Sequence, residues 1–194
     1  YSWFVPHDQA GLFRAMGGDA KVVARLDQMF DYDTSTLDYS HAEDIAGLIG
    51  QYIHGNEPSH HIAHLYNYVG QPWRTQEIVD EVLHTLYFNN PDGLSGNEDC
   101  GQMSAWYILN AMGFYQVCPG KPVYSIGRPL FNEATVHLKD GKSFKVIAHN
   151  NSRDNKYVRS IVLNGNKLET PFFTHQDIVD GGTLELTMGS EPLK

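Results

Sequence analysis

The hydrophobic residues of this chain change their spacing once, near Pro119-Gly120. Over residues 19–30 apolar side chains recur every three or four positions, which is the period of an amphipathic helix. Over residues 134–138 apolar and polar side chains alternate, as they do in a strand with one buried face. The sequence therefore predicts an α+β fold, with a helical region over residues 1–116 and a small antiparallel β region over residues 117–194.

Six segments of the first region have helical spacing of apolar residues. The predicted helices span about residues 9–16, 19–30, 45–52, 59–69, 72–86 and 99–112. Asp8 and Asp19 are suited to cap the first two, and Pro72 suits the first turn of the fifth. Residues 31–40 are rich in Asp, Thr and Ser and predict a loop. Helices joined by short loops pack as antiparallel pairs, which leaves open an independent bundle or half of a toroid of paired helices.

The β region carries two strong turn signals. Asp140-Gly141 separates two alternating segments, and Asn164-Gly165 follows another over residues 157–163. These dipeptides favour the tight turns of β-hairpins. Alternation over residues 184–188 predicts the last strand.

Composition limits the classes of partner. The 194 residues suffice for one large domain or two small ones. The formal net charge of −9 argues against nucleic acid, because phosphate groups need a basic face. The sequence has no run of about 20 apolar residues, so no membrane span is predicted. Cys100 and Cys118 flank a predicted helix that holds them apart, which predicts two free thiols.

Polar residues gather at the ends of predicted elements, over residues 5–8, 54–61 and 96–99. If the helices pair in sequence, the ends of alternate helices share one rim, which brings these loops together. Glu57 and Asp99 then offer two carboxylates, and glycoside cleavage uses a carboxyl group on each side of the bond. A structural interpretation stays open, in which both acids only begin helices.

The same loops offer ligands for a metal ion. Their oxygen donors suit calcium better than zinc, and come from Asn56, Glu57, Asn97, Glu98 and Asp99. His60 and His64 stand four residues apart, but the HExxH motif is absent. One alternative is therefore a zinc-dependent hydrolase that uses His60 and His64, and another is packing of His64 in the core.

Three tryptophans are candidates for stacking on a sugar ring. Trp3 lies beside His7 and Asp8 and is the strongest candidate. Trp73 and Trp106 lie in predicted helices, where hydrophobic packing explains them as well. A non-catalytic carbohydrate-binding module is a further alternative.

A set of longer segments runs through almost the whole chain. They are residues 5–8 (VPHD), 55–61 (GNEPSHH), 66–73 (YNYVGQPW), 93–107 (GLSGNEDCGQMSAWY), 113–115, 118–120, 126–131 (IGRPLF) and 150–152. In this order and spacing the chain resembles glycoside hydrolase family 92. The resemblance implies a calcium-dependent, exo-acting α-mannosidase that inverts the anomeric centre. It further implies a fold with an N-terminal β-sandwich, an (α/α)6 barrel and further β structure.

The resemblance also assigns roles to single residues. It implies that Asp99 is the general base, assisted by Asn97 and Glu98, although many relatives have an acid at the position of Asn97. It matches Asn56 and Glu57 to a loop that faces the sugar, and the converging loops offer further candidates for sugar binding in Trp3, His7, Asp8, His60 and His61. From the oxygen donors of the same loops, Glu57 and Asn97 are the candidate ligands of calcium. Relatives specific for α-1,2 linkages often have His where this chain has Asn56, so the linkage preference stays open.

By the same resemblance the chain is the C-terminal part of a larger enzyme. The sandwich, the first part of the barrel and the general acid, which sits in a Glu-Gly segment of the family, are expected before Tyr1. We therefore expect the 194 residues alone to be inactive and to bind calcium weakly. The expected partners are the missing N-terminal part and mannose-containing glycans, and the expected location is extracytoplasmic, with a role in N-glycan degradation.

Overall fold

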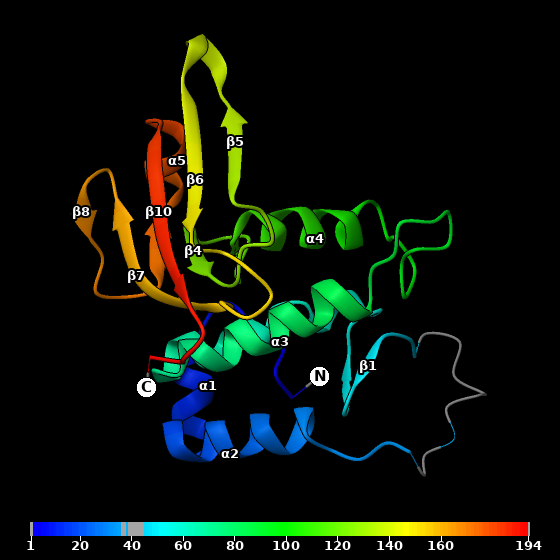
Figure 1. Cartoon of the computed structure of the whole chain (residues 1–194). Helices are drawn as coiled ribbons and strands as arrows, with labels where there is room; N and C mark the ends of the chain where they lie inside the picture. Colours follow the sequence, from blue (N-terminus) through cyan, green and yellow to red (C-terminus); the bar gives the residue numbers. More distant parts are fainter. Residues whose placement is uncertain (1, 36–37, 39–44, 194) are drawn as a thin grey trace.

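The computed structural model describes residues 2–35, 38 and 45–193 (Figure 1). Four α-helices of the first region confirm four of the predicted ones: α1 (Gln9–Ala15), α2 (Asp19–Phe30), α3 (Pro72–Thr85) and α4 (Gln102–Met112). Asp8 caps α1 as predicted, because its carboxylate accepts a hydrogen bond from the Gly11 N–H at 2.8 Å. Asp19 lies one residue inside α2 instead of capping it, and Gly18 occupies the cap position.

The predicted helix over residues 45–52 is wrong. This segment is a small hairpin of β1 (Leu48–Ile49) and β2 (Tyr52–Ile53). Gly50 turns the chain with a φ of 56°, and a Cβ atom there would lie 2.3 Å from the carbonyl oxygen of Met29. The close approach to the end of α2 therefore decides the conformation, and apolar spacing carries no sign of it.

The segment predicted as the fourth helix is helical, but of the tighter 3-10 type. It consists of η1 (Glu57–Ser59) and η2 (Ile62–Val69), and Gly70 ends it with a φ of 72°. Helix η2 packs against both α2 and α3 and is buried over most of its length. The predicted loop over residues 31–40 lies partly outside the described residues.

The C-terminal region forms two sheets beside the helices (Figure 1). The larger has the strand order β5 (Glu133–His137), β6 (Ser143–His149), β10 (Gly182–Gly189), β7 (Tyr157–Leu163), β8 (Asn166–Lys167). The smaller has the order β3 (Phe114–Tyr115), β4 (Val123–Ile126), β9 (Phe172–Thr174), and the short helices η3 (Lys139–Gly141) and α5 (His175–Val179) complete the region. The expected α+β class with small antiparallel sheets is confirmed.

Strand pairing in the larger sheet adds one feature that alternation does not predict. Strand β10 is parallel to β6 and antiparallel to β7. A parallel partner needs a crossover connection, and here the chain passes through β9 and α5 before it reaches β10. Both predicted hairpin turns are confirmed, with positive φ at Asp140-Gly141 and Asn164-Gly165.

Two hydrophobic clusters form the core. The first gathers helical residues, including Val22, Leu26, Leu65, Val79 and Trp106. The second lies under the sheets and includes Ile126, Phe144, Val146, Leu184 and Leu186. Phe114 belongs to the second cluster and its neighbour Tyr115 to the first, so the chain changes core at this point. The division between residues 116 and 117, and membership of the helices in an (α/α)6 barrel, stay predictions.

A buried ion pair joins the helical region to the β region. Arg128 is only 2% exposed, and its Nε lies 2.8 Å from Oδ1 of Asp80 on α3. The same guanidinium donates to the carbonyl oxygens of Pro129 and Ser152. Residues 126–131 and 150–152, which carried part of the family resemblance, therefore build this junction. No helix of the described residues is long and apolar enough to cross a bilayer.

Candidate functional site

Two Gly-Asn-Glu tripeptides of the sequence meet in the fold through their glycines. They are residues 55–57 and 96–98. A Cβ atom at Gly96 would lie 2.4 Å from the Gly55 carbonyl oxygen, and one at Gly55 would lie 2.5 Å from that of Ser95. Only residues without a side chain allow this approach of backbone to backbone. The predicted convergence of these two loops is therefore present, and it brings Glu57 near the start of α4.

Glu98 and Asp99, the two acids that precede α4, have different surroundings. Glu98 accepts hydrogen bonds from the N–H and the hydroxyl of Ser104, at 3.0 and 2.7 Å. These bonds lower the pKa of the Glu98 carboxyl. Gly101 occupies the N-cap position of α4, so the structural interpretation of Asp99 as the N-cap is wrong, and Glu98 binds Ser104 in the first turn of the helix. The assisting role predicted for Glu98 stays a prediction, with its carboxylate already engaged.

Asp99 occupies a special backbone position. Asp99, Cys100 and Gly101 follow one another with φ values of 39°, 60° and 88°. Residues other than glycine cost about 1–3 kcal/mol each in this region, and such strain concentrates at functional sites. The Asp99 side chain is exposed and makes no hydrogen bond or ion pair with the part of the chain that is described. Its carboxylate is thus presented to solvent, free to act on a ligand.

His60 ties the loop of Glu57 to α4. Its Nε2 donates to the carbonyl oxygen of His54 at 2.9 Å, and its Nδ1 accepts from the Gln102 amide at 3.2 Å. The indole N–H of Trp106 donates to the His60 carbonyl oxygen at 3.0 Å. Burial lowers the pKa of His60 to about 4, so the ring is neutral near pH 7. His60 therefore holds Glu57 and the first turn of α4 in a fixed relation.

His54 lies in the polar segment over residues 54–61, but the sequence predicted no role for it. Its ring stacks on His60 with centroids 4.8 Å apart. Nδ1 is 2.8 Å from the hydroxyl of Tyr52, and Nε2 is 2.6 Å from that of Tyr87. Because Tyr87 donates to the Met103 carbonyl, it accepts from Nε2 of His54. Burial lowers the pKa of His54 to about 2, so this residue is a neutral support.

Both ring nitrogens of the buried His64 are engaged in hydrogen bonds. Nε2 lies 2.8 Å from the Asn110 side-chain oxygen, and Nδ1 lies 3.0 Å from the Ser125 hydroxyl. Asn67 completes this network by donating to Ser125. Across residues 2–35, 38 and 45–193, no three His, Cys, Asp or Glu side chains gather as a metal site would require. The packing alternative for His64 is therefore confirmed, and the zinc alternative built on His60 and His64 loses its ligand.

A cleft of about 270 Å³ opens beside Glu57. It is lined by Phe4, Pro6, Glu57, Pro58, His60, His61, Gln102, Tyr115, Gln116, Val117 and Pro119. His7 and Asp8 follow Pro6 directly, and Asp99 precedes Gln102 by three residues, but their side chains are not part of this lining. Whether they complete one shared site stays a prediction.

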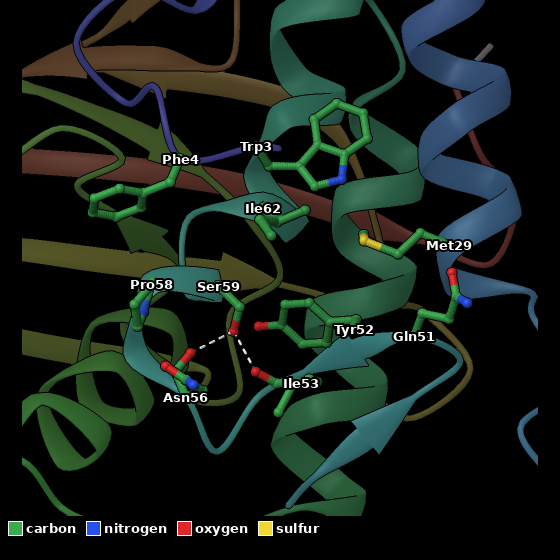
Figure 2. Close-up of a pocket in the computed structure, with 10 residues that line it drawn as sticks. All are labelled: Trp3, Phe4, Met29, Gln51, Tyr52, Ile53, Asn56, Pro58, Ser59 and Ile62. Carbon is green, nitrogen blue, oxygen red and sulfur yellow. Dashed lines mark hydrogen bonds between the residues drawn. The ribbon is translucent and has the colours of Figure 1, made fainter. Parts of the chain in front are cut away.

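Trp3, which was predicted to stack on a sugar ring, is buried, whereas its neighbour Phe4 is exposed. Trp3 is 8% exposed and belongs to the helical core, and its carbonyl oxygen accepts from Nε2 of His61 at 2.8 Å. Phe4 is 51% exposed and meets the ring of His61 edge-on, with centroids 5.8 Å apart. Figure 2 shows both aromatic rings at a second groove of about 200 Å³, together with Asn56. Of these two aromatic side chains, Phe4 is therefore the better placed to touch a ligand.

The predicted calcium ligands have the right type of donor atom, but two residues are too few to complete a calcium site. Glu57 and Asn97 supply hard oxygen donors, and the contact of Gly55 with Gly96 brings their loops together. Calcium takes about 6–8 oxygen ligands. The remaining ligands of the ion would have to come from other groups than Glu57 and Asn97.

Comparison with known proteins places the chain in one family. The model of the glycosyl hydrolase family 92 catalytic domain matches residues 1–190. An uncharacterized secreted glycosidase of Arthroderma benhamiae is 33% identical over 192 residues, covering 97% of this chain and 23% of the relative.

Two solved structures from Bacteroides thetaiotaomicron are each 42% identical to the chain. The family GH92 alpha-mannosidase BT3965, in complex with mannoimidazole, matches all of this chain with 25% of its own, at a TM-score of 0.93. The family GH92 inverting mannosidase BT2199 matches 99% of this chain with 27% of its own, at a TM-score of 0.85. The chain thus spans about a quarter of these relatives, and it belongs to the catalytic domain of glycosyl hydrolase family 92.

Proposed function

We propose that the chain supplies one side of the active site of an exo-acting, inverting α-mannosidase that releases terminal mannose from glycans. One observation carries this proposal. The exposed carboxylate of Asp99 lies on a left-handed turn of the backbone. The close contact between Gly55 and Gly96 places the loop of Glu57 near this turn. The mannosidase relatives named above support the choice of mannose. The secreted relative supports an extracytoplasmic location and a role in glycan degradation.

Asp99 is proposed as the general base. Its carboxylate takes a proton from a water molecule while that water attacks the anomeric carbon. The bond from this carbon to the leaving oxygen breaks, and the oxygen receives a proton from an acid on the other face of the sugar. The two carboxyl groups of inverting glycosidases stand about 6.5–9.5 Å apart, so that the water fits between base and sugar.

The neighbouring residues have supporting roles in this proposal. Glu98 holds the start of α4 through Ser104, which leaves Asp99 as the acid of this pair that is able to accept a proton. His60 is neutral and keeps Glu57 against α4. Phe4, His61 and Glu57 then form the wall on which a mannose ring is bound.

Calcium is proposed as a cofactor of the whole enzyme. When bound, the ion would hold and polarise sugar hydroxyl groups. In this chain Glu57 and Asn97 are the candidates to hold it, since their oxygen donors suit a hard cation. Because two ligands fall short of the required number, the rest of the polypeptide is proposed to complete the site.

The test of the general base uses the full polypeptide that contains this chain. Asp99→Asn should lower mannose release from an α-mannobiose by about 10²–10⁴-fold, because a positioned proton acceptor contributes that much. Asp92→Asn is a matched control, since Asp92 is an exposed acid of the preceding loop. Activity of Asp99→Asn within threefold of the control would show that Asp99 is not the base.

The fragment itself offers a second test. We expect residues 1–194 alone to release no mannose at a useful rate, because the acid that protonates the leaving oxygen is proposed to lie outside them. The purified fragment and the full polypeptide would be incubated with calcium and α-mannobiose, and released mannose measured. Equal turnover would place the acid within these residues and make Glu57 its first candidate.

A further inference from the structure

A separate groove, of about 160 Å³, lies at the N-terminal end of α3, between that helix and strands β7 and β8. Its lining mixes apolar and polar residues: Pro72, Trp73, Gln76, Val158, Arg159, Ser160, Ile161, Lys167, Leu168, Glu169, Thr170, Pro171 and Leu193. None of these residues lines the cleft beside Glu57.

Trp73 lies in this groove and belongs to neither hydrophobic cluster of the core. Its side chain is half-buried, yet it makes no aromatic contact with the described residues. Its indole N–H also donates no hydrogen bond within those residues. A large apolar ring with a free donor is suited to a ligand that is apolar on its face and polar at its edge.

Gln76 adds a second unused donor to the same groove. The residue is 4% exposed, and its side-chain oxygen accepts from the N–H of Val158 at 3.1 Å. This bond fixes the amide group, while its NH2 makes no hydrogen bond in the described part of the chain. The exposed hydroxyl of Thr170 faces no partner either. The groove therefore offers fixed hydrogen-bonding groups around an aromatic face.

The groove is well separated from the proposed active site. Trp73 lies in the first turn of α3, and Tyr87, which supports His54, lies two residues beyond its end. A helix of 14 residues is about 20 Å long, at 1.5 Å for each residue. A ligand in this groove therefore does not touch the sugar that is bound at Glu57.

We infer that this groove is an accessory carbohydrate site that binds one pyranose ring of a glycan against Trp73. The sugar places its apolar C–H face on the indole, while its hydroxyl groups accept from Trp73 Nε1 and Gln76 Nε2. Charged ligands are less suited, because the charges at the rim are already used. Lys167 pairs with Glu169 at 3.0 Å, and Arg159 donates to the Glu191 carbonyl. The choice of mannose as probe rests on the proposed function.

The test measures retention of the full polypeptide in native gels that contain yeast-type α-mannan. The Glu57→Ala variant provides the background, since it removes sugar binding at the proposed active site. In that background Trp73→Ala should weaken retention by about tenfold or more, as the loss of a buried aromatic anchor does. Thr170→Trp, which fills the groove from its exposed rim, should weaken it as much. Neither variant should change the rate of mannose release from a soluble mannobiose when Glu57 is intact.

The outcomes separate this inference from the proposed function. Unchanged retention in both variants would overturn the accessory site, and would show that the groove is covered by another part of the polypeptide. If Trp73→Ala also lowers the melting temperature, Thr170→Trp decides the result. Absence of mannose release from the wild type would overturn the proposed function, whereas retention lost on filling the groove would still support a carbohydrate site.

Discussion

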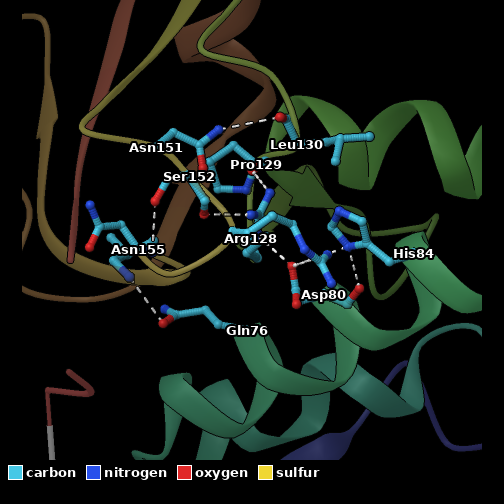
Figure 3. A network of polar contacts seen from close by, with 11 residues as sticks. Gln76, Asp80, His84, Arg128, Pro129, Leu130, Asn151, Ser152 and Asn155 are labelled. Atoms are coloured by element: carbon cyan, nitrogen blue, oxygen red, sulfur yellow. Dashed lines mark hydrogen bonds and ion pairs between the residues drawn. The ribbon is translucent and has the colours of Figure 1, made fainter. Parts of the chain in front are cut away.

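Removing the charge of Asp80 should loosen the junction between the helical and β regions. Arg128 is 2% exposed, and its Nε lies 2.8 Å from Oδ1 of Asp80; Figure 3 shows this pair. Arg153 also approaches Asp80, so the carboxylate faces a second cation at 3.8 Å. Loss of one partner from a buried ion pair costs about 3–5 kcal/mol, because the other charge stays buried without compensation.

This cost converts to a shift in melting temperature. For a protein region of this size, 1 kcal/mol corresponds to about 2–4 °C, so Asp80→Asn should lower the melting temperature by about 6–20 °C. Thermal unfolding of purified residues 1–194, followed by circular dichroism, measures this shift. Asp154→Asn is the matched control, since Asp154 is exposed. The double variant Asp80→Leu/Arg128→Met should be less destabilised than Asp80→Asn, because it leaves no charge buried. A shift below about 2 °C for Asp80→Asn would refute the reasoning.

Three further predictions follow from the site. Gly96→Ala should lower mannose release by about 100-fold, because its Cβ atom would lie 2.4 Å from the Gly55 oxygen and displace the loop of Glu57; Gly120→Ala, with no atom within 4 Å, is its control. Stability should fall as pH is lowered from 6.5 towards 4, since burial lowers the pKa of His60 and His64 to about 4 and the unfolded chain then binds more protons. Melting temperatures across this range measure the effect, and a flat profile would contradict it. Chelation of calcium should stop mannose release by the full polypeptide, and added calcium should restore it. Calorimetry should show that residues 1–194 alone bind calcium much more weakly than the full polypeptide does. Equal affinity would show that the rest of the polypeptide supplies no ligand.

Local signals in the sequence were sufficient for the elements that local interactions stabilise. The helices over Gln9–Ala15, Asp19–Phe30 and Pro72–Thr85 follow from apolar spacing, because their buried faces repeat with the helical period. The hairpin turns at Asp140-Gly141 and Asn164-Gly165 follow from residues that accept a positive φ. The ordered motifs also identified the family, whose model matches residues 1–190.

Contacts between distant segments decided the rest. The apolar spacing over residues 45–52 fits a helix, but the approach of Gly50 to Met29 makes the segment a hairpin. The parallel pairing of β10 with β6 depends on the path through α5, which alternation does not encode. At the candidate site, Glu98 and Asp99 are adjacent in sequence and equal in charge. Only the tertiary structure shows that Glu98 binds Ser104 while Asp99 stays exposed, because the left-handed backbone over Asp99, Cys100 and Gly101 decides which partner each side chain reaches.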